Sequence, residues 1–116
     1  MRDLEIDAKG GVIMQKVFVL YRLKPGVKLE DYRKWSVNMD QKTTPFQPGV
    51  HRFEVYEIEG AEKGQSPYQI VEDIDVESWE AWQQVLTSEG QKQVVETWAK
   101  YGDESTLTVI YGKKIK

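Results

Sequence analysis

A small set of side chains in this sequence could move a proton at neutral pH. His51 is the only histidine, and imidazole has an ordinary pKa near neutrality, which makes His51 the default general base. Asp40 could work with it, while Tyr56 and Glu72 add a hydroxyl and a second carboxylate. The set predicts general acid–base catalysis on a small molecule. The alternatives are an exposed His51 at a strand start and a solvated Asp40 near a helix terminus.

Four further residues are candidates for ligand binding because they lie on predicted strands. Tyr21 could offer its hydroxyl to a cavity, or it could be a core residue whose tip reaches water. The others share strand faces with the catalytic candidates. These ligand-binding candidates are Tyr21, Arg52, Tyr68 and Ile70.

The alternation of the middle strands decides where such a cavity would lie. If Phe53 and Val55 face the helices, then Arg52 and Tyr56 face the opposite side of the sheet. We expect a second copy of the chain to pack on that side. We expect Glu72 to meet Tyr56 there, so that side chains of both strands line a pocket. The alternative is a solvated strand edge with hydrogen bonds across an interface. A bulge of one residue would exchange the two faces.

Composition bounds the class of protein. The chain has 116 residues, 40% hydrophobic and 30% charged, which is typical of one globular domain. A net charge of −3 argues against binding to nucleic acid or an anionic membrane, and no apolar run approaches the roughly 20 residues that span a bilayer. The absence of cysteine fits a cytoplasmic protein. We expect residues 1–13 to be a flexible extension and 14–116 to be the domain.

Several kinds of site lack the residues that they need. The sequence has no cysteine and one histidine, too few for a structural zinc site, and neither predicted helical region has a histidine to hold haem iron. There is no glycine-rich phosphate loop, and the acidic "YQIVEDI" does not fit the signature of an RNA-binding RRM. We therefore expect no metal and no cofactor.

The chain reads as an alternation of strands and helices. Apolar and alternating runs predict strands at 15–24, 50–60, 68–76 and 105–115, and helical stripes occupy 27–41, 77–86 and 88–101. The order β-α-β-β-α-β is that of ferredoxin-like α+β domains. Right-handed crossovers place the helices on one face of a four-stranded antiparallel sheet.

The first strand is apolar on both faces. Val17 and Val19 point one way, and Phe18 and Leu20 point the other. Because the predicted helices cover one face only, we expect a second copy of the chain to cover the other. The expected assembly is a homodimer with the architecture of a dimeric α/β barrel.

The four tryptophans fall on apolar helical stripes. Trp35, Trp79, Trp82 and Trp98 follow helical spacing and are expected to be core residues, the alternative being an aromatic cage around a ligand.

Four motifs carry a resemblance to a known family. They are "LKPG" at 23–26, Tyr-x-x-Trp at 32–35, Phe-x-Val-Tyr at 53–56 and Ser-Pro-Tyr at 66–68. With the segments around them, residues 14–116 resemble the REDY-like protein HapK family of dimeric α/β barrels, which is associated with biosynthesis of prodigiosin-type pigments. Asp40 and Trp35 match positions of that family's first helix. The resemblance also implies a start at Met14, next to the first strand.

The resemblance implies a cytoplasmic dimeric barrel that holds a small aromatic or apolar metabolite. We expect a cofactor-independent enzyme of secondary metabolism, such as a cyclase, an isomerase or an oxygenase. The alternative is a non-catalytic module that binds a ligand or a partner. Fold alone does not decide between the two.

Overall fold

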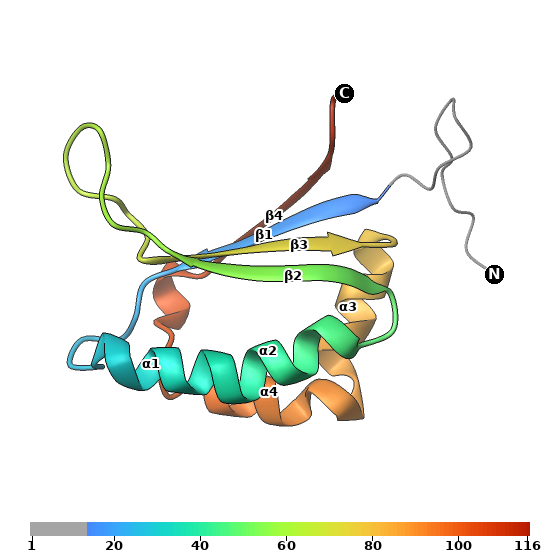
Figure 1. The fold of residues 1–116 in the computed structure, drawn as a ribbon, viewed down its shortest axis with the longest axis horizontal. Coiled ribbons are helices and arrows are strands. Elements are labelled where there is room, and N and C mark those ends of the chain that lie inside the picture. The colour runs from blue at the N-terminus through green and yellow to red at the C-terminus, as the bar shows by residue number, and fades with distance from the viewer. Residues whose placement is uncertain (1–13) are drawn as a thin grey trace.

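The computed structural model describes residues 14–116 and contains one four-stranded sheet (Figure 1). The predicted extension at 1–13 lies outside the described residues. The strand order is β2-β3-β1-β4, and every neighbouring pair is antiparallel. The strands are β1 (Gln15–Tyr21), β2 (Val50–Glu57), β3 (Ile70–Val76) and β4 (Thr108–Lys113).

Each crossover between strands is helical. The first contains α1 (Leu29–Trp35), a π-helical turn (Ser36–Asp40), α2 (Gln41–Thr43) and a 3₁₀ turn (Thr44–Phe46). The second contains α3 (Trp79–Thr87), a 3₁₀ turn (Glu89–Gln91) and α4 (Lys92–Trp98), and a further 3₁₀ turn (Glu104–Thr106) precedes β4. The labelled helices all lie on one side of the sheet (Figure 1). The predicted ferredoxin-like arrangement is therefore confirmed.

The core lies between the sheet and this helix layer. The inward positions of β1 and β3 alternate with outward ones, as expected for strands. The inward positions are apolar with one exception in β3, because Glu72 occupies the inward position between Ile70 and Ile74. The fully buried strand residues are Val17, Tyr21, Ile70, Ile74 and Val76.

The predicted helix 27–41 is regular only as far as Trp35. The backbone N–H of Gln41 bonds to the carbonyl of Ser36, five residues earlier, which is the hydrogen bond of a π-helix. Ser36, Asp40 and Thr44 follow one another at steps of four, and all three lie on the buried side of this segment. Short π segments occur frequently at functional sites.

A bulge near the start of β2 sets the faces of that strand. The register with β3 shifts between Val50 and Arg52, leaving His51 outside the regular pairing. Beyond the bulge, Phe53 pairs with the inward Ile74 and is itself buried. The condition considered for this strand, that Phe53 faces the helices, is therefore met.

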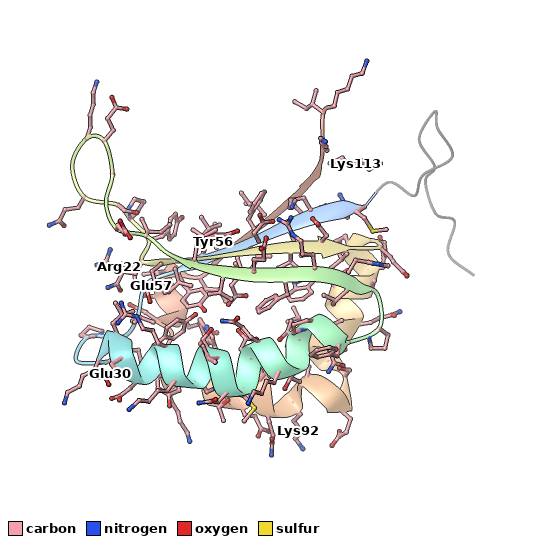
Figure 2. The ribbon with its side chains drawn as sticks, viewed as in Figure 1. Arg22, Glu30, Tyr56, Glu57, Lys92 and Lys113 are labelled. Carbon is pink, nitrogen blue, oxygen red and sulfur yellow. The ribbon has the colours of Figure 1, made fainter. Side chains whose placement is uncertain are left out.

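The face of the sheet away from the helices, the outer face, is half apolar and half charged. The strand register places Phe18, Leu20, Tyr56, Val71 and Ile110 together on it, and we call these five residues the apolar patch. Tyr56 and Ile110 are 48% and 52% exposed, and Tyr56 projects from the open side of the sheet (Figure 2).

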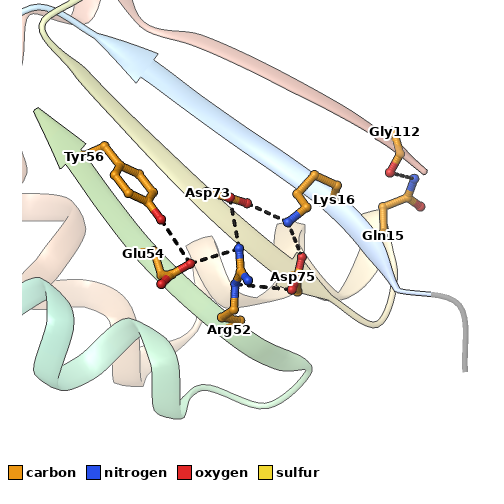
Figure 3. Close-up of polar contacts among 8 residues, drawn as sticks. All are labelled: Gln15, Lys16, Arg52, Glu54, Tyr56, Asp73, Asp75 and Gly112. Carbon is orange, nitrogen blue, oxygen red and sulfur yellow. Dashed lines mark hydrogen bonds and ion pairs between the residues drawn. The ribbon is translucent and has the colours of Figure 1, made fainter. Parts of the chain in front are cut away.

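The charged half of the outer face is a cross-strand network. Lys16 pairs with Asp73 and Asp75, and Arg52 pairs with the same two aspartates and with Glu54 (Figure 3). The sequence predicts an apolar outer face because the first strand is apolar on both sides. The structure differs, since this charged network occupies part of that face. Since the charges are paired within one chain, this half needs no partner to neutralise it.

Gly102 is required by the packing of Trp98, and this gives a stability prediction. A Cβ at Gly102 would lie 2.1 Å from the Trp98 ring, whereas a Cβ at Gly112 in β4 would meet nothing within 4 Å. We expect Gly102→Ala to lower the free energy of unfolding by about 1–3 kcal/mol through overpacking. Chemical denaturation measures the loss. Gly112→Ala is the control, and equal stability of the two variants would contradict the packing argument.

Candidate functional site

A cavity of about 400 Å³ lies between the sheet and the helix layer. Its walls are mostly apolar and carry three tryptophans. Some lining side chains are partly exposed, including Leu86, Val95 and Leu107, so the cavity opens to the surface beside them. The lining residues are Val19, Trp35, Asp40, Thr44, Glu72, Trp82, Leu86, Gln91, Val94, Val95, Trp98, Ala99, Glu104, Leu107 and Val109.

Two buried carboxyl groups stand out against this apolar lining. Asp40 is 3% exposed and Glu72 is 6% exposed. The π-helical turn brings Asp40 to the cavity from the helix layer, and the alternation of β3 brings Glu72 from the sheet. A buried carboxyl group is costly unless it is hydrogen-bonded or protonated, so the partners of both groups decide their chemistry.

Glu72 is held by a chain of two tyrosine hydroxyls. Tyr21 Oη donates to Glu72 Oε2 at 2.7 Å, and the Tyr21 and Tyr32 hydroxyl oxygens lie 2.6 Å apart. Because Tyr21 has one hydroxyl proton and gives it to Glu72, Tyr32 must donate to Tyr21. Burial raises the pKa of both tyrosines, so both remain protonated donors.

Asp40 is held by a similar chain from the helix layer. Thr44 Oγ1 donates to Asp40 Oδ1 at 2.6 Å. Gln91 Nε2 donates to the same Thr44 oxygen at 2.7 Å. The two carboxyl groups are therefore oriented by separate sets of donors, one from β1 and α1 and the other from the two crossovers.

Burial shifts the pKa of both carboxyl groups upward. Burial raises the pKa of Asp40 from 3.8 to about 6, against the opposing effect of the Thr44 hydrogen bond. Burial also raises the pKa of Glu72 well above its ordinary value, and the negative charge of Asp40 adds to this shift. The hydrogen bond from Tyr21 opposes it.

This arrangement favours one proton shared between two acids. Two carboxylates facing one apolar cavity do not both ionise readily near neutral pH, because each disfavours the charge of the other. Glu72 is held further toward its protonated form, and Asp40, with a pKa of about 6, is the group that ionises more readily. One group can then accept a proton from a bound molecule while the other donates one.

The structure brings together Asp40 and Glu72 from the predicted catalytic set, but on the side of the sheet opposite to the one expected. Glu72 faces the helices, whereas Tyr56 and Arg52 face away from them. The prediction that Tyr56 and Glu72 meet in one pocket on the dimer side is therefore wrong. Val55, not Tyr56, pairs with Glu72, because Phe53 and Val55 share the inward face. The alternative of a solvated Asp40 is also wrong.

The remaining predicted site residues lie outside the cavity lining. His51 is exposed, with its Nε2 atom 3.3 Å from Glu77 Oε1. The hydroxyl groups of Tyr68 and Thr108 are hydrogen-bonded on the outer face, with their oxygen atoms 3.0 Å apart. Ile70 is a core residue, and Tyr21 is fully buried behind Glu72, so its hydroxyl tip does not reach water.

Sequence reasoning did not single out Thr44 or Gln91 as site residues. Trp35, Trp82 and Trp98 pack in the helix layer as predicted, and they also line the cavity. A signal for the site was present on the first crossover, where polar Ser36, Asp40 and Thr44 continue a buried stripe at steps of four. Charged or polar residues at inward positions are unusual enough to mark a site.

Two classes of site find no support within residues 14–116. No group of three or more histidine, cysteine, aspartate or glutamate side chains is placed to hold a metal ion in this part of the chain. Among the same residues, no helix has the length and apolar character needed to cross a membrane.

Comparison with protein families gives one match that covers most of the chain. The model of the family described as REDY-like protein HapK matches residues 15–115. No curated protein sequence matches the chain.

Solved structures with the same fold are similar to this chain at low sequence identity. HapK from Hahella chejuensis has a TM-score of 0.72 at 20% identity, covering 88% of this chain and 93% of that one. A dimeric ferredoxin-like protein from Thermobifida fusca has a TM-score of 0.70 at 10% identity, covering 98% and 99%. A hydroxynitrile lyase from Passiflora edulis has a TM-score of 0.70 at 8% identity, covering 90% and 95%.

The raised pKa values predict how stability depends on pH. Because Asp40 titrates at about 6 in the folded chain instead of 3.8, the native state holds more protons than the unfolded state between these values. The free energy of unfolding therefore falls as the pH rises through this interval. We expect Asp40→Asn to lose this dependence. Its free energy of unfolding should exceed that of the wild type by an amount that grows by roughly 1–3 kcal/mol between about pH 4 and pH 8.

Denaturant titrations at several pH values measure this difference. Glu72→Gln should shift the dependence in the same direction, since the pKa of Glu72 is also raised. The control is Glu104→Gln, which changes an exposed carboxylate of the cavity lining and should keep the wild-type pH dependence. A wild-type protein and an Asp40→Asn variant with parallel pH profiles would contradict the burial of a costly charge.

Proposed function

The chain belongs to the REDY-like protein HapK family, and from this premise we propose that its cavity binds a small, largely apolar or aromatic metabolite and catalyses a proton transfer on it without a cofactor. The observation that carries the proposal is the pair of buried carboxyl groups in an apolar cavity. Asp40 and Glu72 are the acid–base residues of this proposal. A cyclisation or an isomerisation is the class of reaction that needs only such groups.

The cost of burying Asp40 and Glu72 supports a function in catalysis. An apolar side chain at either position would fill the core without a desolvation penalty, and natural proteins keep strongly perturbed acids chiefly where chemistry uses them. A cavity of about 400 Å³ lies in the range of small-molecule sites. The same fold is also used by an enzyme, the hydroxynitrile lyase from Passiflora edulis.

Asp40 is the proposed general base and Glu72 the proposed general acid. A base works best when its pKa lies near the working pH, and the Asp40 value of about 6 meets that condition. Asp40 takes a proton from carbon next to a carbonyl group, and the C–H electron pair becomes the new carbon–carbon double bond. Glu72 gives its proton to the carbonyl oxygen, so that an enol forms. When the enol is conjugated to a further double bond, Asp40 returns its proton to the far carbon while the enol O–H proton goes back to Glu72 and the carbonyl group re-forms, which completes an isomerisation.

The alternative proposal is a non-catalytic module that uses the same cavity to carry or sense a ligand. The apolar walls supply binding in either case, because burial of apolar ligand surface drives association. The two proposals differ in whether a bound carbonyl compound exchanges its protons.

Hydrogen–deuterium exchange measured by NMR in heavy water tests the catalytic proposal without knowledge of the natural substrate. Enolisable ketones that carry an aromatic ring, such as 4-hydroxyphenylacetone, are the probes. We expect the wild-type protein to speed incorporation of deuterium next to the carbonyl, and Asp40→Asn and Glu72→Gln to lower the rate by about 10²–10⁴-fold. Glu96→Gln, which removes an exposed carboxylate of α4 outside the cavity lining, is the control and should retain the wild-type rate.

The outcome distinguishes the two proposals. Probes that bind in the cavity without protein-dependent exchange would favour the binding module. Exchange that survives in both carboxyl variants would contradict the assignment of Asp40 and Glu72.

We further propose that two copies of the chain pair through the outer face of the sheet. The apolar patch supplies the contact surface, and large exposed apolar side chains such as Tyr56 and Ile110 are costly to leave in water. The similar structure from Thermobifida fusca is described as dimeric. The ion pairs of Lys16 and Arg52 form the polar rim of the proposed interface.

Light scattering coupled to size-exclusion chromatography tests the dimer. Ile110→Glu places a charge within the apolar patch, on the edge strand β4, and should convert the dimer into a monomer at micromolar concentration. Phe46→Glu is the control, because Phe46 is 79% exposed in the helix layer and lies away from the outer face. A wild-type monomer, or an unchanged mass for Ile110→Glu, would contradict the pairing.

A place in secondary metabolism and a cytoplasmic location belong to the same proposal. Membership of the family supports the first, and the lack of cysteine is compatible with a reducing compartment.

A further inference from the structure

We propose that the molecule bound in the cavity is uncharged and carries two polar groups, a carbonyl oxygen that accepts from Trp82 Nε1 and a hydroxyl or N–H group that donates to Gln91 Oε1. The inference rests on the proposed function and names the substrate class for that same site. Two buried polar atoms without partners, an acidic cavity and aromatic walls carry it.

Trp82 presents a buried donor. Its side chain lines the cavity and is 3% exposed, and within the described part of the chain its Nε1 atom has no hydrogen-bond partner. An indole N–H can only donate. Since a buried donor left unpaired is destabilising, a ligand oxygen at this position would recover that cost.

Gln91 presents a buried acceptor. It is 2% exposed and lines the same cavity, and its Oε1 atom has no partner among residues 14–116. The orientation of the amide is fixed by its neighbours. Thr44 gives its hydroxyl proton to Asp40, so its oxygen can only accept from Gln91, which must therefore turn its NH₂ group toward Thr44. The carbonyl oxygen of Gln91 is left for a ligand donor.

The charge of the lining selects against anions. The only charged residues among those that line the cavity are acidic, namely Asp40, Glu72 and Glu104. A carboxylate, phosphate or thioester-linked nucleotide would bring negative charge into an apolar space with no lysine, arginine or histidine to pair it. Like charges in a low-dielectric site repel strongly, which excludes an anion. An uncharged molecule also avoids the desolvation cost that a cation would have in this mostly apolar cavity.

The walls favour a flat, unsaturated molecule. Trp35 and Trp98 line the cavity together with Trp82, and aromatic rings stack favourably on such surfaces. The indole N–H of Trp35 is already used, because it donates to Thr97 Oγ1 at 2.7 Å. Trp35 therefore contributes a surface, whereas Trp82 contributes a surface and a donor. An uncharged hydroxylated aryl ketone combines all of these features.

Binding of matched probes tests the inference by isothermal titration calorimetry. The reference probes are the 3- and 4-hydroxybenzophenones. Benzophenone lacks the hydroxyl, 4-benzylphenol lacks the carbonyl, and 4-benzoylbenzoate exchanges the hydroxyl for an anion. We expect the better hydroxybenzophenone to bind about 5-fold more tightly than each probe with one polar group missing, as one net hydrogen bond provides. The anion should bind more weakly still.

Variants connect each probe group to one side chain. Trp82→Phe should weaken the ketones about 5-fold and leave 4-benzylphenol nearly unchanged, since only the ketones use the donor. Trp35→Phe is the matched control and should change all probes alike. Gln91→Leu should abolish the advantage of the hydroxyl. Thermal melts of each variant check that it is folded.

The possible results separate this inference from the proposed function. If benzophenone, 4-benzylphenol and both hydroxybenzophenones bind equally, or if the anion binds best, the substrate class is overturned while a binding cavity remains. If Trp82→Phe and Trp35→Phe act alike on every probe, the donor assignment is overturned. If none of the probes binds, both this inference and the proposed function fail.

Discussion

The burial of two carboxyl groups against one face of the sheet determines much of this structure. Asp40 and Glu72 lose most of their contact with water, and charge in such surroundings is costly. Two chains of hydroxyl and amide donors reduce this cost, and protonation of one group reduces it further. The π-helical turn places Asp40 at the cavity, and the inward position in β3 places Glu72 at the same cavity.

The two sides of the sheet therefore have different purposes. The helix side holds the cavity and its acids, whereas the outer face holds the apolar patch and a closed network of ion pairs. A dimer formed through the outer face would leave the cavity of each chain intact, because none of the five residues of the apolar patch lines it. The proposed dimer and the proposed catalysis can therefore be tested by separate substitutions.

Periodicity in the sequence predicts the fold well and the location of the site poorly. Alternation in β1 and β3 and the helical stripes give the element order, because these patterns record burial directly. The predicted site lay on the wrong side of the sheet, because the prediction combined the outward face of β2, which carries Arg52 and Tyr56, with the inward face of β3, which carries Glu72. Glu72 lies among Ile70, Ile74 and Val76, and this inward setting is readable from the sequence. The buried setting of Asp40 is readable in part from the steps of four that join Ser36, Asp40 and Thr44. The donor chain that holds Asp40 is not, because Gln91 comes from the second crossover and reaches Thr44 only in the folded chain.

The protonation states of Asp40 and Glu72 are the central claim, and carbon-13 NMR of the side-chain carboxyl carbons measures them most directly. The structure predicts that Asp40 titrates at about 6 and that Glu72 stays protonated well above the ordinary pKa of glutamate. Removal of one group by Asp40→Asn should lower the pKa of Glu72, because a negative neighbour is lost. The account would be contradicted if both groups titrate near pH 4 in the wild type and Glu72 has the same pKa in Asp40→Asn.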